Sequence, residues 1–271
     1  MSDKLTQEEL RRGSPIQVFY SGNNKSFPTI SHAKGLYMWD TDDKKYFDAS
    51  SGPVATNLGH GNSNVLEAMK LQSEKVCFAS YSVFENEPNK ILAKNLVKLA
   101  GPNYDQAFIV SGGSEAIESA FKLARQYAEA IGQSKRSKIL SRSASYHGST
   151  LGAFAATGDP QTEEIFGIMA KLMPKVKTPF SYRLPENHDV DSYARECLKD
   201  LEDTIIEEGA ESILAFIVES VGGLATGGLV APNFYYSAIR EICSRYGILL
   251  IFDDVMAGAG RTGTFLSAEH W

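Results

Sequence analysis

Two adjacent carboxylates, Asp253 and Asp254, follow an apolar run at residues 248–252 and precede a glycine-rich stretch at 258–263. The run predicts a fully buried strand of a parallel sheet, whose C-terminal end lies at the edge where open α/β folds bind ligands. A carboxylate that is half-buried at that edge is costly unless it has a partner. We therefore expect a ligand beside these acids, with a buried structural acid pair as the alternative.

A second candidate site is the glycine turn Ser111-Gly112-Gly113-Ser114, which follows an apolar run at 107–110 that predicts a short strand. Free N–H groups at the start of the next helix, together with the Ser114 hydroxyl, can bind a phosphate group. Taken alone, the turn is more typical of an ordinary helix start in which Ser114 is the N-cap.

Two more side chains follow predicted strands. Tyr146, in Tyr146-His147-Gly148, comes after a strand predicted at 138–140 and can stack on a flat ligand, although a core tyrosine is the simpler interpretation. Glu219 directly follows an apolar run at 213–218, where a solvated acid at the rim is the alternative. Together the four strand ends offer a phosphate cradle, a stacking group and carboxylates, which is the set that pyridoxal 5′-phosphate requires.

The spacing Gly258-x-Gly260-x-x-Gly263 also matches the dinucleotide fingerprint. That motif needs its first glycine at the strand end, a helix directly after it and an acid about 20 residues further on. The first glycine comes too late after the strand, so we regard nucleotide binding as a weak alternative. A magnesium-binding strand of a nucleotide hydrolase is disfavoured too, because the chain has no G-x-x-x-x-G-K-[ST] loop.

Helices and strands that alternate from about residue 63 must position these residues. The pattern predicts an α/β fold, with a mostly parallel sheet and helices on both faces. Helices are expected at 64–76, from Pro88, from Ser114, at 189–208 and from Pro232. A hairpin is expected within residues 35–48, and a short helix within 1–13. We place the boundary between an N-terminal part of a small domain (1–62) and a large domain (63–271) at the change of pattern.

Composition narrows the class of protein. The 271 residues are 43% hydrophobic and 22% charged, with a net charge of −6, which argues against nucleic acid or an anionic membrane as the main partner. The polar N-terminus predicts no signal peptide, and no apolar run reaches membrane-spanning length. Cys77, Cys197 and Cys243 are scattered, so we expect buried free thiols, no metal site and a cytoplasmic location.

These motifs resemble the class III (omega-type) aminotransferases, which are pyridoxal phosphate enzymes of fold type I. Residues 253–263 are similar to the family pattern D-E-V-x-x-G-x-G-R-T-G, and 111–116 to its phosphate loop. Tyr146-His147-Gly148 resembles its Y-H-G, and residues 35–48 and 57–61 its N-terminal hairpin and N-x-G-H-G. The resemblance covers the chain from about residue 30 onward.

The resemblance implies a role for each matching position. Asp253 is the catalytic candidate, because it pairs with the pyridinium nitrogen of the cofactor in this family. The remaining implied cofactor-binding residues are Gly113, Ser114, Tyr146, His147, Glu219, Val255 and Met256, with the Val255 side chain on the ring face opposite Tyr146. The implied substrate-pocket residues are Ser51, Gly52 and Val54.

The chain departs from the family pattern at three positions. Asp254 stands where Glu is usual, Met256 where many members have Gln, and Ser220 where Pro is common. The resemblance also implies a Schiff-base lysine downstream of Gly263, which this chain lacks. We therefore expect a fragment that is inactive by itself.

For the parent protein, the resemblance implies transfer of an amino group from an amine or omega-amino acid to a keto acid such as pyruvate. It also implies a homodimer with the active site at the subunit interface. Three alternatives stay open: another pyridoxal phosphate reaction on the same fold (aminomutase, racemase or decarboxylase), a non-catalytic protein that binds pyridoxal phosphate, or the nucleotide-binding protein considered above.

Overall fold

The computed structural model describes residues 27–271, so the helix expected within 1–13 lies outside the described residues. The chain divides into two compact units. Of the described residues, the first unit holds 27–52 together with 56–71, and the second holds 53–55 and 72–271. The domain boundary expected at 62/63 stays a prediction.

The first unit contains a three-stranded antiparallel sheet in the order β1-β2-β3. Its strands are β1 (Ile30–Lys34), β2 (Tyr37–Asp40) and β3 (Lys45–Phe47), so the predicted hairpin is confirmed and β1 adds a strand. Asp40 holds the tight turn, because its Oδ1 accepts hydrogen bonds from the backbone N–H groups of Asp42 at 3.0 Å and Lys44 at 2.9 Å.

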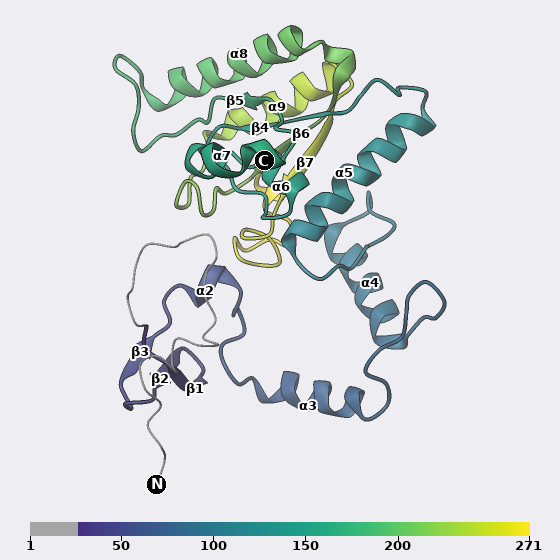
Figure 1. The fold of residues 1–271 in the computed structure, drawn as a ribbon, viewed down its shortest axis with the longest axis vertical. Coiled ribbons are helices and arrows are strands. Elements are labelled where there is room, and N and C mark those ends of the chain that lie inside the picture. Colours follow the sequence, from purple (N-terminus) through teal and green to yellow (C-terminus); the bar gives the residue numbers. More distant parts are fainter. Residues whose placement is uncertain (1–26) are drawn as a thin grey trace. The chain divides into compact units, whose positions relative to one another are not determined.

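A parallel sheet in the order β5-β4-β6-β7 organises the second unit (Figure 1). Its strands are β4 (Lys138–Arg142), β5 (Lys175–Val176), β6 (Ile213–Glu219) and β7 (Leu249–Asp253). Helices α5 (Gly113–Ala130) and α6 (Leu151–Ala156) pack on one face, and α8 (Val190–Glu208) and α9 (Asn233–Arg245) on the other. The predicted α/β class is confirmed.

Shorter or peripheral elements complete the described part of the chain. They are α2 (Ser51–Val54), α3 (Ser63–Ser73), α4 (Glu87–Ala100), α7 (Pro160–Phe166), η2 (Gly167–Met169), η3 (Ala210–Ser212) and η4 (Ser267–His270). None of the helices within residues 27–271 is long and apolar enough to cross a membrane.

Strand β6 is the centre of the core, because every one of its residues is buried. Side chains alternate across a strand, so successive β6 residues serve opposite faces of the sheet. Phe216 and Val218 pack with residues of α8 and α9, whereas Ala215 and Ile217 pack with residues of α5 and α6. This two-sided burial explains why the β6 sequence is apolar without interruption.

Helix boundaries follow the expected signals with one exception. Asp189 caps α8 by accepting a hydrogen bond from the Ser192 N–H at 2.7 Å, and Pro232 directly precedes α9. Ser114 was expected to cap α5, but Gly112 is the N-cap and Ser114 lies inside the first turn. The Ser114 hydroxyl instead accepts the Ser149 N–H at 3.0 Å, a partner that lies 35 residues away.

Two strand predictions need correction. Strand β7 is not fully buried: only Asp253 is, because β7 is the edge strand of the described sheet and has β6 as its one neighbour. Residues 107–110 form no strand, and the Phe108 side chain is exposed. A strand exists only within a ladder, and no strand among the described residues pairs with this segment.

The three cysteines differ in the exposure of their side chains. Cys197 and Cys243 are buried, and burial raises the pKa of each thiol to about 11. Cys77 is exposed, which contradicts the expectation of a buried thiol, because it follows α3, a helix that buries none of its residues.

Candidate functional site

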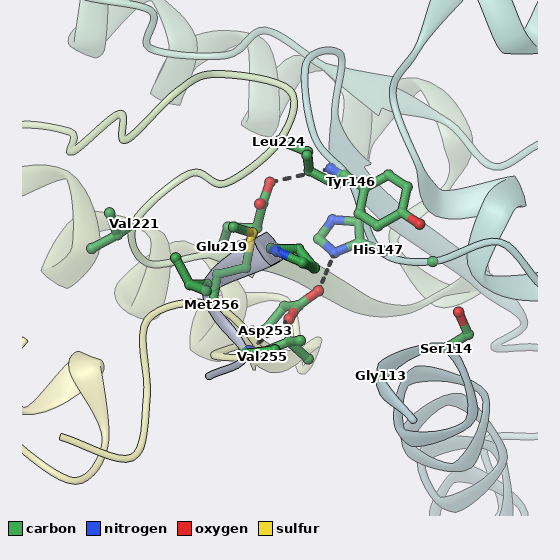
Figure 2. Close-up of a pocket in the computed structure, with 14 residues that line it drawn as sticks. Gly113, Ser114, Tyr146, His147, Glu219, Val221, Leu224, Asp253, Val255 and Met256 are labelled. Carbon is green, nitrogen blue, oxygen red and sulfur yellow. Dashed lines mark hydrogen bonds and ion pairs between the residues drawn. The ribbon is translucent and has the colours of Figure 1, made fainter. Parts of the chain in front are cut away.

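A cavity of about 350 Å³ lies beside the C-terminal ends of β6 and β7 (Figure 2). Nine residues predicted from the sequence line it: Val54, Gly113, Ser114, Tyr146, His147, Glu219, Asp253, Val255 and Met256. Its volume lies within the range of small-molecule sites. Ser51 and Gly52 belong to the other unit, and their role stays a prediction.

Asp253 is one of the two acids that line the cavity, and two hydrogen-bond partners hold its carboxylate. Its Oδ2 lies 2.8 Å from His147 Nδ1, and its Oδ1 accepts the Val255 N–H at 3.1 Å. The Asp253 side chain is 6% exposed and that of His147 is 0% exposed. Because a buried carboxylate needs donors, this pairing fixes where the charge sits and which way it points. Figure 2 shows the pair at the centre of the cavity lining.

His147 is itself held in place through its backbone. Its N–H donates to Thr157 Oγ1 at 2.9 Å, just beyond the end of α6. The second ring nitrogen, Nε2, is buried and has no hydrogen-bond partner among the described residues. Since Asp253 can only accept when ionised, the Nδ1 atom of His147 carries the shared hydrogen.

Glu219 connects two loops at the edge of the sheet. Its carboxylate accepts the Tyr146 N–H at 3.2 Å and the Gly223 N–H at 2.8 Å. The backbone carbonyl of Glu219 accepts from Nη2 of the buried Arg142 at 2.6 Å, which joins the ends of β4 and β6. Glu219 therefore sets the position of the Tyr146 backbone.

The start of α5 borders the same cavity. Gly113 is the first residue of the helix, and the N–H groups of a first turn have no partners within the helix. A Cβ atom on Gly113 would lie 3.2 Å from a Val255 methyl carbon, so a side chain there would crowd the cavity wall. With the dipole of an 18-residue helix behind it, this end of α5 favours a bound anion.

The part of the cavity lining that comes from early in the chain contains a residue with strained backbone. Val54 lies in the cavity lining with a φ angle of 54°, a conformation that β-branched residues rarely adopt. Strained backbone of this kind concentrates at ligand-binding sites. The Val54 carbonyl accepts from Arg261 Nη2 at 3.4 Å.

Sequence reasoning missed the loop after β6. Val221 and Leu224 line the cavity, and Gly223 lies against Met256, since a Cβ on Gly223 would come 2.2 Å from the Met256 sulfur. The signal was present in the glycines at 222, 223, 227 and 228, which lie in the segment after the strand predicted at 213–218.

The dinucleotide alternative does not survive the geometry of residues 258–263. This segment turns back on itself, with the Ala259 N–H bonded to the Phe265 carbonyl at 2.8 Å and the Gly260 N–H to the Thr264 carbonyl at 3.0 Å. The element that follows is the short 3₁₀ helix η4, whereas a dinucleotide fold needs a long helix that starts at the glycines.

Comparison with known proteins identifies the family of the chain. The family profile described as aminotransferase class-III matches residues 19–271. The uncharacterised aminotransferase YodT of Bacillus subtilis is 39% identical over 249 residues, which cover 92% of this chain and 56% of YodT. The hypotaurine/taurine–pyruvate aminotransferase of Paracoccus denitrificans is 31% identical over 255 residues, covering 92% and 54%.

A solved structure shares the fold. The amine transaminase from an uncultivated Pseudomonas species, crystallised in its pyridoxal phosphate-bound form, matches with a TM-score of 0.86 and 31% identity, over 93% of this chain and 58% of that one. The chain thus spans about half the length of the relatives it matches. From the profile match over most of its length, together with the cavity at the sheet edge, the chain belongs to the class-III aminotransferase family.

Proposed function

We propose that the chain forms the cofactor-binding part of a pyridoxal phosphate-dependent aminotransferase, which moves an amino group from an amine or omega-amino acid to a keto acid such as pyruvate. The observation that carries the proposal is the buried Asp253 carboxylate, which faces the cavity and is held by His147 and by the Val255 N–H. A buried acid that is oriented so firmly is suited to pair with a cationic ring nitrogen.

The donor set of the cavity fits this cofactor. A flat ring needs an aromatic surface, which Tyr146 offers, and a phosphate needs N–H and hydroxyl donors, which the start of α5 and Ser114 offer. Gly113 leaves the approach to the helix start open, whereas a Cβ at that position would meet Val255. When bound, pyridoxal phosphate supplies the conjugated system that accepts the electrons released from the amino donor.

Each residue of this chain then has a definite task. Asp253 would accept a hydrogen bond from the ring nitrogen, and His147 orients the Asp253 carboxylate. Tyr146 and Val255, which both line the cavity, would confine the ring. Glu219 holds the Tyr146 backbone, so that the stacking surface does not drift away from the acid.

Met256 supports the choice of substrate class. Its thioether offers no strong hydrogen bond, so this part of the wall is apolar and adaptable. An apolar wall suits simple amines and omega-amino acids better than a substrate with a second carboxylate. Of the three residues that the resemblance assigns to the substrate pocket, Val54 lines the cavity.

Cofactor binding is the first test. Equilibrium dialysis of the 271-residue chain against pyridoxal phosphate should show saturable binding, which Asp253→Asn weakens at least tenfold, because the amide cannot balance a cationic ring. Asp203→Asn, on the exposed surface of α8, is the control and should bind like the wild type. Wild-type binding no tighter than that of Asp253→Asn would contradict the proposal.

Turnover is the second test, and it uses the longer protein that contains this chain. Incubation with an amine and pyruvate should produce alanine if the reaction is transamination. Racemised or decarboxylated donor without alanine would identify one of the alternative pyridoxal phosphate reactions instead.

We further propose a cytoplasmic homodimer with the active site at the subunit interface. Large apolar side chains are exposed in the segment after α3, among them Phe78, Tyr81 and Phe84, and exposed apolar patches mark protein interfaces. The three cysteines are all free thiols, as expected in a reducing compartment. Light scattering of the longer protein would give the mass of one dimer if the proposal is correct.

A further inference from the structure

A cluster of three residues lies next to the cavity but does not line it: Ser220, Asp254 and Ser267, which we call the serine–aspartate clamp. Asp254 Oδ1 accepts hydrogen bonds from Ser220 Oγ at 2.8 Å and from Ser267 Oγ. Asp254 Oδ2 accepts the Ser267 backbone N–H at 2.8 Å. The two serine hydroxyls also contact each other, and both serines are fully buried.

The clamp joins three segments that are distant in sequence. Ser220 directly follows β6, Asp254 directly follows β7, and Ser267 is the first residue of η4. A further hydrogen bond holds Ser220 in place, because its backbone carbonyl accepts from the hydroxyl of the buried Tyr236 at 2.5 Å. One carboxylate therefore fastens the end of an edge strand and the start of η4 to the buried central strand.

Between Asp254 and Ser267 runs a twelve-residue loop, 255–266, which begins with two residues of the cavity wall, Val255 and Met256. Within the loop the backbone hydrogen bonds join residues of the segment 258–265, and the Gly258 N–H also donates to the Asp254 carbonyl at 2.8 Å, so none of these bonds is made by Val255 or Met256. The clamp lies at both ends of the loop and so closes its base. Opening the base would move Val255 and Met256.

We propose that Asp254 is a positioning residue, which acts through Ser220 and Ser267 to keep loop 255–266 closed and the Val255–Met256 wall in place. A carboxylate is required because one oxygen serves two hydroxyls while the other serves a backbone N–H, and an amide presents a donor where one of those oxygens must accept. The inference deepens the proposed function, since this wall belongs to the proposed cofactor site.

Limited proteolysis of the 271-residue chain tests the clamp without any ligand. Trypsin cleaves after Arg261, an exposed residue in the loop, and cleavage there tracks the population of the open loop. Cleavage after Lys199, an exposed residue within α8, reports opening of the helix and hence general unfolding. The ratio of the two rates separates loop opening from loss of fold.

Asp254→Asn and Ser220→Ala should each raise the rate at Arg261 at least tenfold and leave the rate at Lys199 unchanged. The double variant should cleave no faster than Asp254→Asn, because the Ser220 hydroxyl acts through the carboxylate. Ser267→Ala, which keeps the N–H donor to Asp254 Oδ2, should give a smaller increase. Ser237→Ala removes a hydrogen-bonded hydroxyl from the exposed side of α9 and should behave like the wild type.

Three results would overturn the inference: rates at Arg261 within twofold of the wild type, equal acceleration at Arg261 and Lys199, or an additive double variant. If Asp254→Asn does not fold, Ser267→Ala and Ser220→Ala still decide the question. Added pyridoxal phosphate should slow wild-type cleavage at Arg261. If it does not, the proposed function is weakened, while the ligand-free rates still judge the clamp.

Discussion

The buried pair between His147 and Asp253 allows a prediction with a built-in comparison. His188 and Glu196 form the same kind of pair at the same 2.8 Å distance, but their side chains are 28% and 36% exposed, against 0% and 6% for His147 and Asp253. Both pairs join a histidine to a carboxylate at the same distance, and they differ in burial, in the acid (Asp or Glu) and in the additional Lys177 partner of Glu196. We predict that replacing the histidine by Phe lowers the free energy of unfolding strongly at position 147 and very little at position 188.

The magnitude follows from burial. Breaking a buried pair leaves a carboxylate without its main partner and costs about 3–5 kcal/mol, whereas an exposed pair contributes about 0–1 kcal/mol. Asp253 keeps the Val255 N–H, so we take the lower end, about 3 kcal/mol, for His147→Phe. That value corresponds to roughly a 150-fold shift in the folding equilibrium, since about 1.4 kcal/mol is tenfold.

Urea unfolding followed by Trp271 fluorescence measures this difference. The chain has two tryptophans, so a Trp39→Phe background leaves Trp271, whose ring stacks on Tyr236 at 4.0 Å in the second unit. His147→Asn is the conservative variant, because its amide nitrogen, like Nδ1, is bonded to Cγ and can donate to Asp253. It should recover part of the lost free energy of unfolding.

Two results would contradict this prediction: a free energy of unfolding of His147→Phe within 1 kcal/mol of the wild-type value, or a loss in His188→Phe as large as that in His147→Phe. In the first case the pair contributes little despite its burial. In the second, burial is not what sets the energy. Failure of His147→Asn to improve on His147→Phe would indicate that ring packing, rather than the hydrogen bond, matters at this position.

Three further predictions rest on single contacts. Gly158→Ala should lower the free energy of unfolding by about 3 kcal/mol or more in the same urea assay, because the new Cβ would lie 2.3 Å from the Arg142 carbonyl oxygen, a backbone atom that cannot move to another rotamer. An unchanged urea midpoint of unfolding would contradict this prediction. Gly223→Ala should displace the flexible Met256 side chain and weaken pyridoxal phosphate binding several-fold, with little loss of stability. Binding by this variant equal to that of the wild type in dialysis would show that the Met256 position does not affect cofactor binding. Burial lowers the pKa of Lys175 to about 8, so between pH 8 and about 10.5 the unfolded chain binds more protons than the folded one. The free energy of unfolding of the wild type should therefore rise across that window by about 1–2 kcal/mol relative to that of Lys175→Met. Parallel profiles of the two free energies against pH would contradict this prediction.

Much of the site was accessible from the sequence because its residues follow strands. An apolar run ends where the strand leaves the core, so Glu219 and Asp253 mark the sheet edge without knowledge of the fold. Helix starts were predicted for the same reason, since Asp189 and Pro232 act within one turn. These signals are local in the chain, and local chemistry is what a sequence displays.

Tertiary structure alone decided which groups pair. His147 and Asp253 are 106 residues apart, and nothing in either neighbourhood names the other. Asp254, next to Asp253 in sequence, has entirely different partners in Ser220 and Ser267. Two adjacent acids thus acquired separate roles, one at the cavity and one at the base of a loop, because successive residues at a strand end point in different directions.

The sequence by itself determined that strands alternate with helices, that polar residues gather at one edge of a parallel sheet, and that glycines border them. Only the tertiary structure decided that residues 107–110 form no strand, that β7 is an edge strand and that Ser114 does not cap its helix. The physical reason is the same in each case. Propensity and periodicity belong to a segment, whereas a ladder, a buried face or a hydrogen-bond partner exists only when another segment is brought alongside it.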